Sequence, residues 1–93
     1  MEGLSTFQYD ILAVLLREDE LHGLGIKSEL AKRFPKYDEV NHGRLYPNLQ
    51  ALTETHGYIE QGELDKRTNL YSLTPAGKDV LRERAAQLYG DAQ

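Results

Sequence analysis

Residues 40–58 read Val-Asn-His-Gly-Arg-Leu-Tyr-Pro-Asn-Leu-Gln-Ala-Leu-Thr-Glu-Thr-His-Gly-Tyr, and this stretch decides the fold of the chain. Leu45, Leu49 and Leu52 recur at i, i+4 and i+7, which predicts a helix with one apolar stripe. The opposite face is small and polar, because it carries Arg44, Pro47, Gln50, Ala51 and Glu54, with Gly43 near its start and Tyr46 on its flank. Small residues allow close approach to another surface, and Arg, Asn and Gln can bond base edges bidentately. The pattern indicates either a recognition surface or an ordinary solvated face.

The start of this helix is open to two interpretations. Asn41 is a good N-cap, but a helix beginning there places Pro47 in its interior. The missing N–H and a clash with the Gly43 carbonyl would then cost up to about 3 kcal/mol. A start near Gly43 or Arg44 puts Pro47 in or just beyond the first turn, where the cost is small. Gly57 predicts a left-handed end to the helix.

Working back towards the N-terminus, a first helix is predicted over about residues 5–17. Ser5 and Gln8 have the spacing of a capping box, in which each side chain bonds the backbone amide of the other residue. The apolar positions of this helix cover more than the roughly 100° that one core contact requires. We therefore expect one of its faces to need a second partner.

A second helix is predicted from about residue 23 to Arg33, where Pro35 ends it. Glu29 and Arg33 have the i, i+4 spacing of a surface ion pair. Residues 35–40 form a short polar connector, so the second and third helices make a helix-turn-helix pair. The inner residues of the second helix are expected to be Leu24, Ile26 and Leu30.

The hydrophobic period changes after the third helix. Residues 58–64 and 69–74 are two extended segments, and the turn Asp65-Lys66-Arg67-Thr68 between them has a basic tip. These segments predict a β-hairpin. Thr74 is an N-cap followed by proline at the first helical position, which predicts a last helix over about residues 75–89.

This order of elements predicts a winged helix-turn-helix of the α+β class, mainly α. It consists of three helices, a two-stranded β-wing and a C-terminal dimerisation helix. We expect residues 1–93 to form one domain. Helix 1 (about 5–17) and helix 4 (about 75–89) carry apolar surface beyond the needs of one core, so they are the expected dimer interface.

Composition limits the possible partners. The chain has 93 residues, no cysteine and a net charge of −4. The absence of cysteine suits a reducing cytoplasm, and residues 11–16, the longest apolar run, are too short to cross a bilayer. We expect a cytoplasmic protein with no membrane partner. Because its charge disfavours non-specific attraction to nucleic acid, DNA contacts must come from local charge and helix ends.

The sequence offers no pattern typical of an enzyme or a metal site. The histidines, His22, His42 and His56, lie on separate elements, and there is no glycine-rich phosphate loop or cysteine nucleophile. We expect no catalytic residue, no metal and no cofactor. The rival hypothesis is a winged helix used as a protein-interaction module, which the acidic balance favours. The acidic residues near the presumed DNA face are Glu54, Glu60, Glu63 and Asp65.

The chain resembles the PadR family of winged-helix transcriptional regulators over about residues 8–81. The resemblance is carried by His22-Gly23 with Ile26 and Leu30, by Gly43-x-Leu45-Tyr46-Pro47-x-Leu49-x-x-Leu52, by Gly57-Tyr58-Ile59, and by Tyr71-x-Leu73-Thr74-Pro75-x-Gly77. Three features depart from the family pattern. The wing tip lacks a Gly-Arg-Pro-rich sequence, the chain ends soon after the fourth helix, and His42 and Arg44 stand where small residues are common.

The resemblance implies a homodimeric regulator, by expectation a repressor, that places two recognition helices in successive major grooves of a palindromic operator in double-stranded DNA. It also allows a small apolar effector between the first and fourth helices. The residues expected to contact DNA are Asn41, His42, Arg44, Tyr46, Asn48, Gln50, Lys66, Arg67 and Thr68. The residues expected in the dimer interface are Phe7, Ile11, Leu15, Leu81, Ala85 and Leu88.

Overall fold

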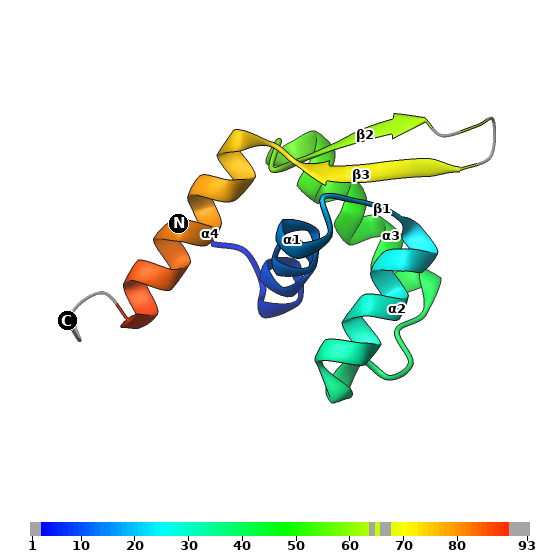
Figure 1. Cartoon of the computed structure of the whole chain (residues 1–93), viewed down its shortest axis with the longest axis horizontal. Helices are drawn as coiled ribbons and strands as arrows, with labels where there is room; N and C mark the ends of the chain where they lie inside the picture. Colours follow the sequence, from blue (N-terminus) through cyan, green and yellow to red (C-terminus); the bar gives the residue numbers. More distant parts are fainter. Residues whose placement is uncertain (1–2, 64, 66–67, 90–93) are drawn as a thin grey trace.

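The computed structural model describes residues 3–63, 65 and 68–89. Within them the winged-helix architecture is confirmed (Figure 1). The elements in order are α1 (Thr6–Glu18), β1 (Glu20–His22), α2 (Gly23–Arg33), η1 (Pro35–Tyr37), α3 (His42–Gln50), η2 (Ala51–Thr55), β2 (Ile59–Glu63), β3 (Asn69–Leu73) and α4 (Pro75–Tyr89).

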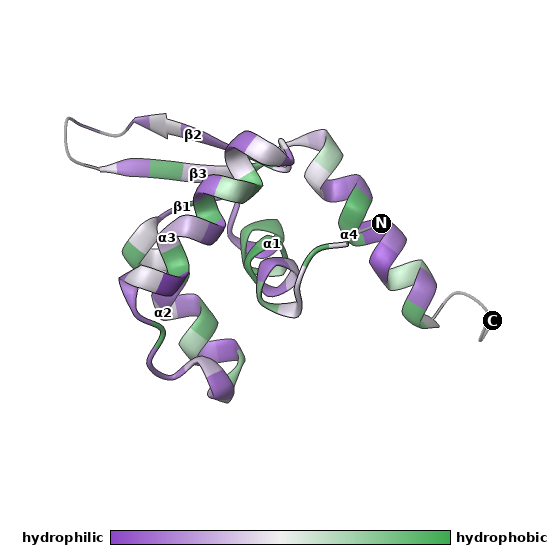
Figure 2. Ribbon diagram, turned by 180° about the vertical axis from the view of Figure 1, so that it is seen from behind, coloured by the Kyte–Doolittle hydropathy of each residue, from purple (hydrophilic) through white to green (hydrophobic). Residues whose placement is uncertain are grey.

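Helix α1 is the centre of the fold. Its predicted capping box is confirmed, because the Gln8 amide donates to Ser5 Oγ and the Ser5 amide donates to Gln8 Oε1. The helix contacts α2, α4, β1 and β3. Figure 2 shows it between the helix-turn-helix on one side and α4 on the other. The face that required a second partner is therefore covered within the same chain.

The helix-turn-helix is formed by α2, η1 and α3. Arg33 joins α2 to α1, because its guanidinium lies 2.9 Å from a Glu18 carboxylate oxygen and 3.1 Å from one of Glu29. The predicted ion pair between Glu29 and Arg33 is thus confirmed. Leu24 was expected inside, but its exposed fraction is 57%. This expectation is wrong because Leu24 lies in the first turn of α2, beside the wing and outside the core.

Helix α3 begins early and keeps a proline in its interior. Asn41 is its N-cap and accepts a hydrogen bond from the Arg44 amide at 2.9 Å. Of the two possible starts, the structure has the earlier one, with Pro47 inside the helix. The Asn48 side chain donates to the Arg44 carbonyl at 2.8 Å, which adds a hydrogen bond in the turn that Pro47 interrupts. After the π-helical segment η2, Gly57 takes a φ of 68° and ends the helix as predicted.

The sheet has one more strand than predicted. Its antiparallel order is β1-β3-β2, with Leu21 opposite Tyr71 and Gln61 opposite the same tyrosine on the other side. The wing hairpin of β2 and β3 is confirmed. Strand β1 was not predicted, because three residues are too few for an alternating pattern to be recognised.

Helix α4 begins at the predicted position and extends away from the rest of the molecule (Figure 1). The Gly77 amide donates to Thr74 Oγ1, and this hydroxyl donates to the Gly57 carbonyl. Val80 and Leu81 are partly buried against the core, whereas the exposed fraction of Leu88 is 59%. No helix in the described part of the chain is long and apolar enough to span a membrane.

Candidate nucleic-acid interface

Helix α3 has a buried apolar side and an exposed side, as its sequence pattern predicts. Leu45 and Leu49 are buried, and Leu52 in η2 continues this stripe into the core. His42, Gly43, Pro47 and Gln50 are exposed. We call these four residues, together with Glu54 in η2, the exposed face. The Gln50 side-chain amide lies 3.4 Å from a Glu54 carboxylate oxygen, a long hydrogen bond that leaves the amide available to another partner.

The predicted contact residue Asn41 already has a structural role. Its side-chain oxygen caps α3, so its NH₂ group is the part of the side chain that this role leaves unused. The ring of His42 lies 5.3 Å from that of Tyr46 with a tilt of 34°, so these two side chains are neighbours on one side of α3. We call this side the wing flank.

On the wing flank, Tyr46 packs against the first residue of α2. A Cβ added to Gly23 would overlap the Tyr46 hydroxyl and ring, so any larger residue at position 23 requires Tyr46 to move from this position. Tyr46 lines a hollow at the base of the wing, together with Thr68, Asn69 and Tyr71. The structure therefore brings two predicted contact residues, Tyr46 and Thr68, together at the base of the wing.

The pKa of Tyr71 depends on its neighbours in this hollow. Burial raises the pKa of Tyr71, and the neighbouring Tyr46 raises it further, while a hydrogen bond from Asn69 acts in the opposite direction. Tyr71 is 5% exposed, whereas Tyr46 is 36% exposed. Tyr46 is therefore the more accessible tyrosine of the pair.

The opposite side of α3, which we call the α1 flank, is held by polar contacts to α1. Asn48 Oδ1 accepts a hydrogen bond from Gln8 Nε2 at 2.9 Å, and Asn48 Nδ2 donates to the Arg44 carbonyl. Both ends of the Asn48 amide are thus used within the protein. Asn48, which was expected to contact DNA, therefore makes hydrogen bonds that hold α3 to α1 and close its own turn.

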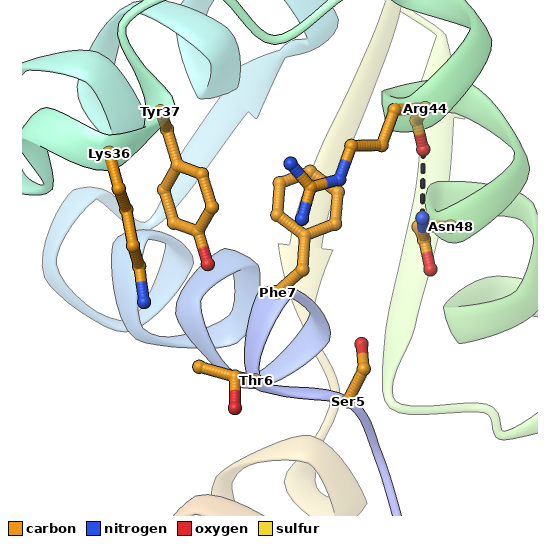
Figure 3. Close-up of a pocket in the computed structure, with 7 residues that line it drawn as sticks. All are labelled: Ser5, Thr6, Phe7, Lys36, Tyr37, Arg44 and Asn48. Carbon is orange, nitrogen blue, oxygen red and sulfur yellow. Dashed lines mark hydrogen bonds between the residues drawn. The ribbon is translucent and has the colours of Figure 1, made fainter.

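Arg44 lies on the α1 flank and away from the exposed face. Its guanidinium carbon is 4.1 Å from the centre of the Phe7 ring and 5.4 Å from that of Tyr37. Figure 3 shows this guanidinium over the Phe7 ring, with Lys36 and Tyr37 beside each other across a hollow. We call this site the α1 hollow. Its floor is formed by Phe7 and Tyr37, and its rim carries Ser5, Thr6, Lys36, Arg44 and Asn48.

Tyr37 is a member of this site that the sequence pattern did not indicate. It belongs to the segment expected to be a polar connector, yet it is 4% exposed. Its hydroxyl donates to Asp10 Oδ2 at 2.6 Å. Burial, followed by this hydrogen bond and the charge of Asp10, raises the pKa of Tyr37 to about 12, although Arg44 lowers it somewhat. The only sequence feature of residues 35–40 that could have indicated this burial was the aromatic side chain of Tyr37 itself.

The wing tip is described only in part. Asp65 Oδ1 accepts a hydrogen bond from the Thr68 amide at 2.9 Å, which closes the turn. The predicted contact residues Lys66 and Arg67 lie outside the described residues.

The residues predicted for the dimer interface separate into two groups. Phe7, Ile11 and Leu15 are at most 4% exposed and fill the core of the single chain, so the apolar surface expected from them on α1 is not available to a partner. The physical reason is the central position of α1. Ala85 and Leu88 are exposed, Leu81 is partly buried, and α1 additionally exposes Leu16 at 53%.

Comparison with known proteins identifies a family and several solved structures that are similar to this chain. Residues 11–83 match the family described as "Transcriptional regulator PadR-like family". RosR of H. salinarum is similar over 97% of this chain and 78% of its own, with 44% identity and a TM-score of 0.85. No curated protein matches the chain.

Two further structures resemble the chain. Bacillus subtilis PadR, in complex with operator DNA, has 28% identity and a TM-score of 0.70. The match covers 87% of this chain, which spans about half the length of PadR (48%). F93 from STIV, a winged-helix DNA-binding protein, has a TM-score of 0.77 and covers 95% of this chain and 92% of its own. At 24% identity, F93 shows similarity of fold alone.

Proposed function

Because the chain belongs to the PadR-like family of transcriptional regulators, we propose that it is a homodimeric repressor that binds a palindromic operator through α3 and the wing. Each protomer would place its α3 in the major groove, and the two half-sites would lie about one helical turn apart. The B. subtilis PadR structure, which contains operator DNA, supports this mode of binding.

The exposed face of α3 carries the proposal. It combines small residues, Gly43 and Pro47, with the amide of Gln50, and the base of the wing lies beside it. Small side chains allow the helix backbone to approach the floor of the groove, and a glutamine amide can bond adenine bidentately. Tyr46 would donate its hydroxyl to a phosphate, which positions the protein without reading sequence.

The dimer would form through the part of α4 that extends from the body. Leu88 and Ala85 are exposed there, and Leu16 is exposed on α1. Large apolar side chains left exposed on an extended helix are candidates for burial against a second copy of the chain. Leu88→Asp should therefore convert the dimer to a monomer in analytical ultracentrifugation, and an unchanged dimer would place the interface elsewhere.

The experiment that tests the function is a fluorescence-anisotropy titration with the DNA upstream of the protein's own gene and with a scrambled duplex, at several salt concentrations. We expect selective binding of one dimer per site that weakens as salt rises. Equal affinity for both duplexes would contradict an operator-specific regulator.

A protein-interaction module is the second candidate, and it is favoured by the exposed carboxylates of Glu54, Glu60 and Glu63. These charges lie on the last turn of the recognition segment and on β2, where they would repel a phosphate backbone. The absence of binding to either duplex at low salt would favour this second function.

A further inference from the structure

The α1 hollow has two cationic side chains, and its described lining contains no carboxylate. Lys36 comes from η1 and Arg44 from α3, while Thr6 from the first turn of α1 faces the same space (Figure 3). The three residues belong to three different elements, so the fold itself brings them together. Such a set of donors is suited to an anion.

Arg44 has hydrogen-bond donors to spare. The guanidinium contacts Phe7 through its flat face, and this contact uses none of its five N–H groups. Within the described part of the chain, no carboxylate lies within ion-pair distance of it. The stack on Phe7 therefore fixes the plane of the guanidinium and leaves its donor edges unpaired.

Lys36 is only loosely paired. Its Nζ lies 3.8 Å from Asp10 Oδ2, longer than a hydrogen bond, and 5.1 Å from the centre of the Tyr37 ring. The same Asp10 oxygen accepts the Tyr37 hydroxyl at 2.6 Å. The carboxylate side chain is 16% exposed, whereas that of Lys36 is 57% exposed. One negative charge beneath two positive charges leaves the hollow with a net charge of +1.

The first turn of α1 adds neutral donors beside these cations. The amides of Thr6 and Phe7 are at positions that have no carbonyl partner within the helix. The hydroxyl of Ser5 accepts the Gln8 amide as a cap, and the side chain of Thr6 is exposed. This helix start supplements the two side-chain cations, which supply the positive charge of the hollow.

We propose that the α1 hollow binds one phosphate of the DNA backbone, next to the base pairs that the exposed face of α3 meets. This inference rests on the proposed function. Arg44 belongs to α3 itself, so a strand that borders the groove occupied by α3 passes along this flank. Arg44 is consequently a phosphate contact and not a base reader, and Lys36 and Thr6 join the DNA-binding surface.

The test begins with the salt dependence of binding. Lys36→Gln and Arg44→Gln are compared with the wild type by anisotropy, on a duplex selected by the wild type from a randomised pool and on its scrambled version. Each variant should reduce the steepness of the fall of log K with log salt, by at most about 0.9, which is the contribution of one phosphate. The loss should be equal on both duplexes, because phosphates carry no sequence information.

Lys32→Gln is the matched control. It removes the same charge from α2, where Lys32 lies 3.3 Å from Glu29. Its slope should equal that of the wild type. An equal drop for Lys32→Gln and Lys36→Gln would show a general charge effect and overturn the assigned site. Circular dichroism of each variant establishes that the fold is retained.

Single methylphosphonate substitutions in the selected duplex identify the source of the anion. Neutralising one particular phosphate should weaken binding of the wild type, and it should weaken binding of Lys36→Gln by less, because that variant has already lost part of the contact. If no such position exists, the anion of the hollow is not a DNA phosphate and the proposal fails. A loss for Arg44→Gln confined to the selected duplex would make Arg44 a base reader and would also overturn it.

The binding experiment distinguishes a failure of the proposed function from a failure of the phosphate site. If the wild type binds no duplex at low salt, the proposed function fails and the phosphate site fails with it. If the wild type binds and the slopes of both variants are unchanged, only the phosphate site fails.

Discussion

On the wing flank of α3, Tyr46 fits against the backbone of Gly23, where an added side chain would displace the tyrosine ring. On the α1 flank, Asn48 and Arg44 meet α1 through an amide hydrogen bond and a cation–π contact. The first flank depends on shape, and the second depends on donors, acceptors and charge. A change of volume should therefore disturb the wing flank, whereas a change of polarity should disturb the α1 flank.

The largest expected effect comes from Tyr37, which supports the α1 flank from below. Tyr37→Phe removes the hydroxyl that donates to Asp10 at 2.6 Å. Because the acceptor is charged and partly buried, the free energy of unfolding should fall by about 1.5–3 kcal/mol at neutral pH. Urea denaturation measures this loss, and an unchanged midpoint would show that the hydrogen bond is not needed.

The same substitution changes the response to alkaline pH. The pKa of Tyr37 is raised from 10.0 to about 12 in the folded chain, so folding favours the protonated phenol. This contribution to stability is fully present below pH 10 and is lost as the pH rises through about 12. Between these values the wild type should lose more stability than Tyr37→Phe. Parallel stability curves for the two proteins would contradict the assignment.

Next in size is Gly23→Ala on the wing flank. The added Cβ would overlap Tyr46, which must turn outwards, and overpacking of this kind costs about 1–2 kcal/mol at a partly exposed site. In the background of Tyr46→Ala, the same glycine substitution should cost almost nothing. Strict additivity of the two substitutions would show that Gly23 and Tyr46 are not coupled.

Much of the fold could be predicted because its signals are local. The capping box of Ser5 and Gln8, the N-cap Asn41 and the left-handed Gly57 each depend on residues a few positions apart, and all three are found in the structure. The apolar stripe of α3 is equally local, since it needs only the helical period. The winged-helix order follows from such elements placed in sequence.

What could not be predicted depends on contacts between distant segments. Tyr37 is buried by Phe7 and Asp10 from α1, and its neighbours in the connector give no sign of this. Strand β1 exists because β3 offers it a partner. Arg44 was correctly expected to have an exposed side chain, but its stack on Phe7 turns it towards α1. Periodicity gives the face of a helix, whereas it cannot give the direction of a long flexible side chain.

The third prediction concerns the amide link of the α1 flank. Asn48→Ala removes the hydrogen bonds to Gln8 and to the Arg44 carbonyl, so the free energy of unfolding should fall by about 1 kcal/mol. Gln50→Ala is the control, because Gln50 is exposed on the same helix and has only the 3.4 Å contact to Glu54. Equal losses for the two variants would reflect helix propensity and not the link to α1.

The smallest expected effect tests the cation–π contact itself. Arg44→Gln keeps a polar side chain but removes the positive charge over the Phe7 ring, and an exposed contact of this kind contributes about 0.5–1 kcal/mol. Because the substitution also changes hydration and helix propensity, the informative quantity is the coupling between Arg44 and Phe7 in a double-mutant cycle with Phe7→Leu. Leucine preserves an apolar side chain in the core and removes the aromatic face. If Arg44 is held by the ring, Arg44→Gln should cost less in the Phe7→Leu background, whereas an equal cost in both backgrounds would mean that the guanidinium is free to leave α1 and reach the exposed face of α3.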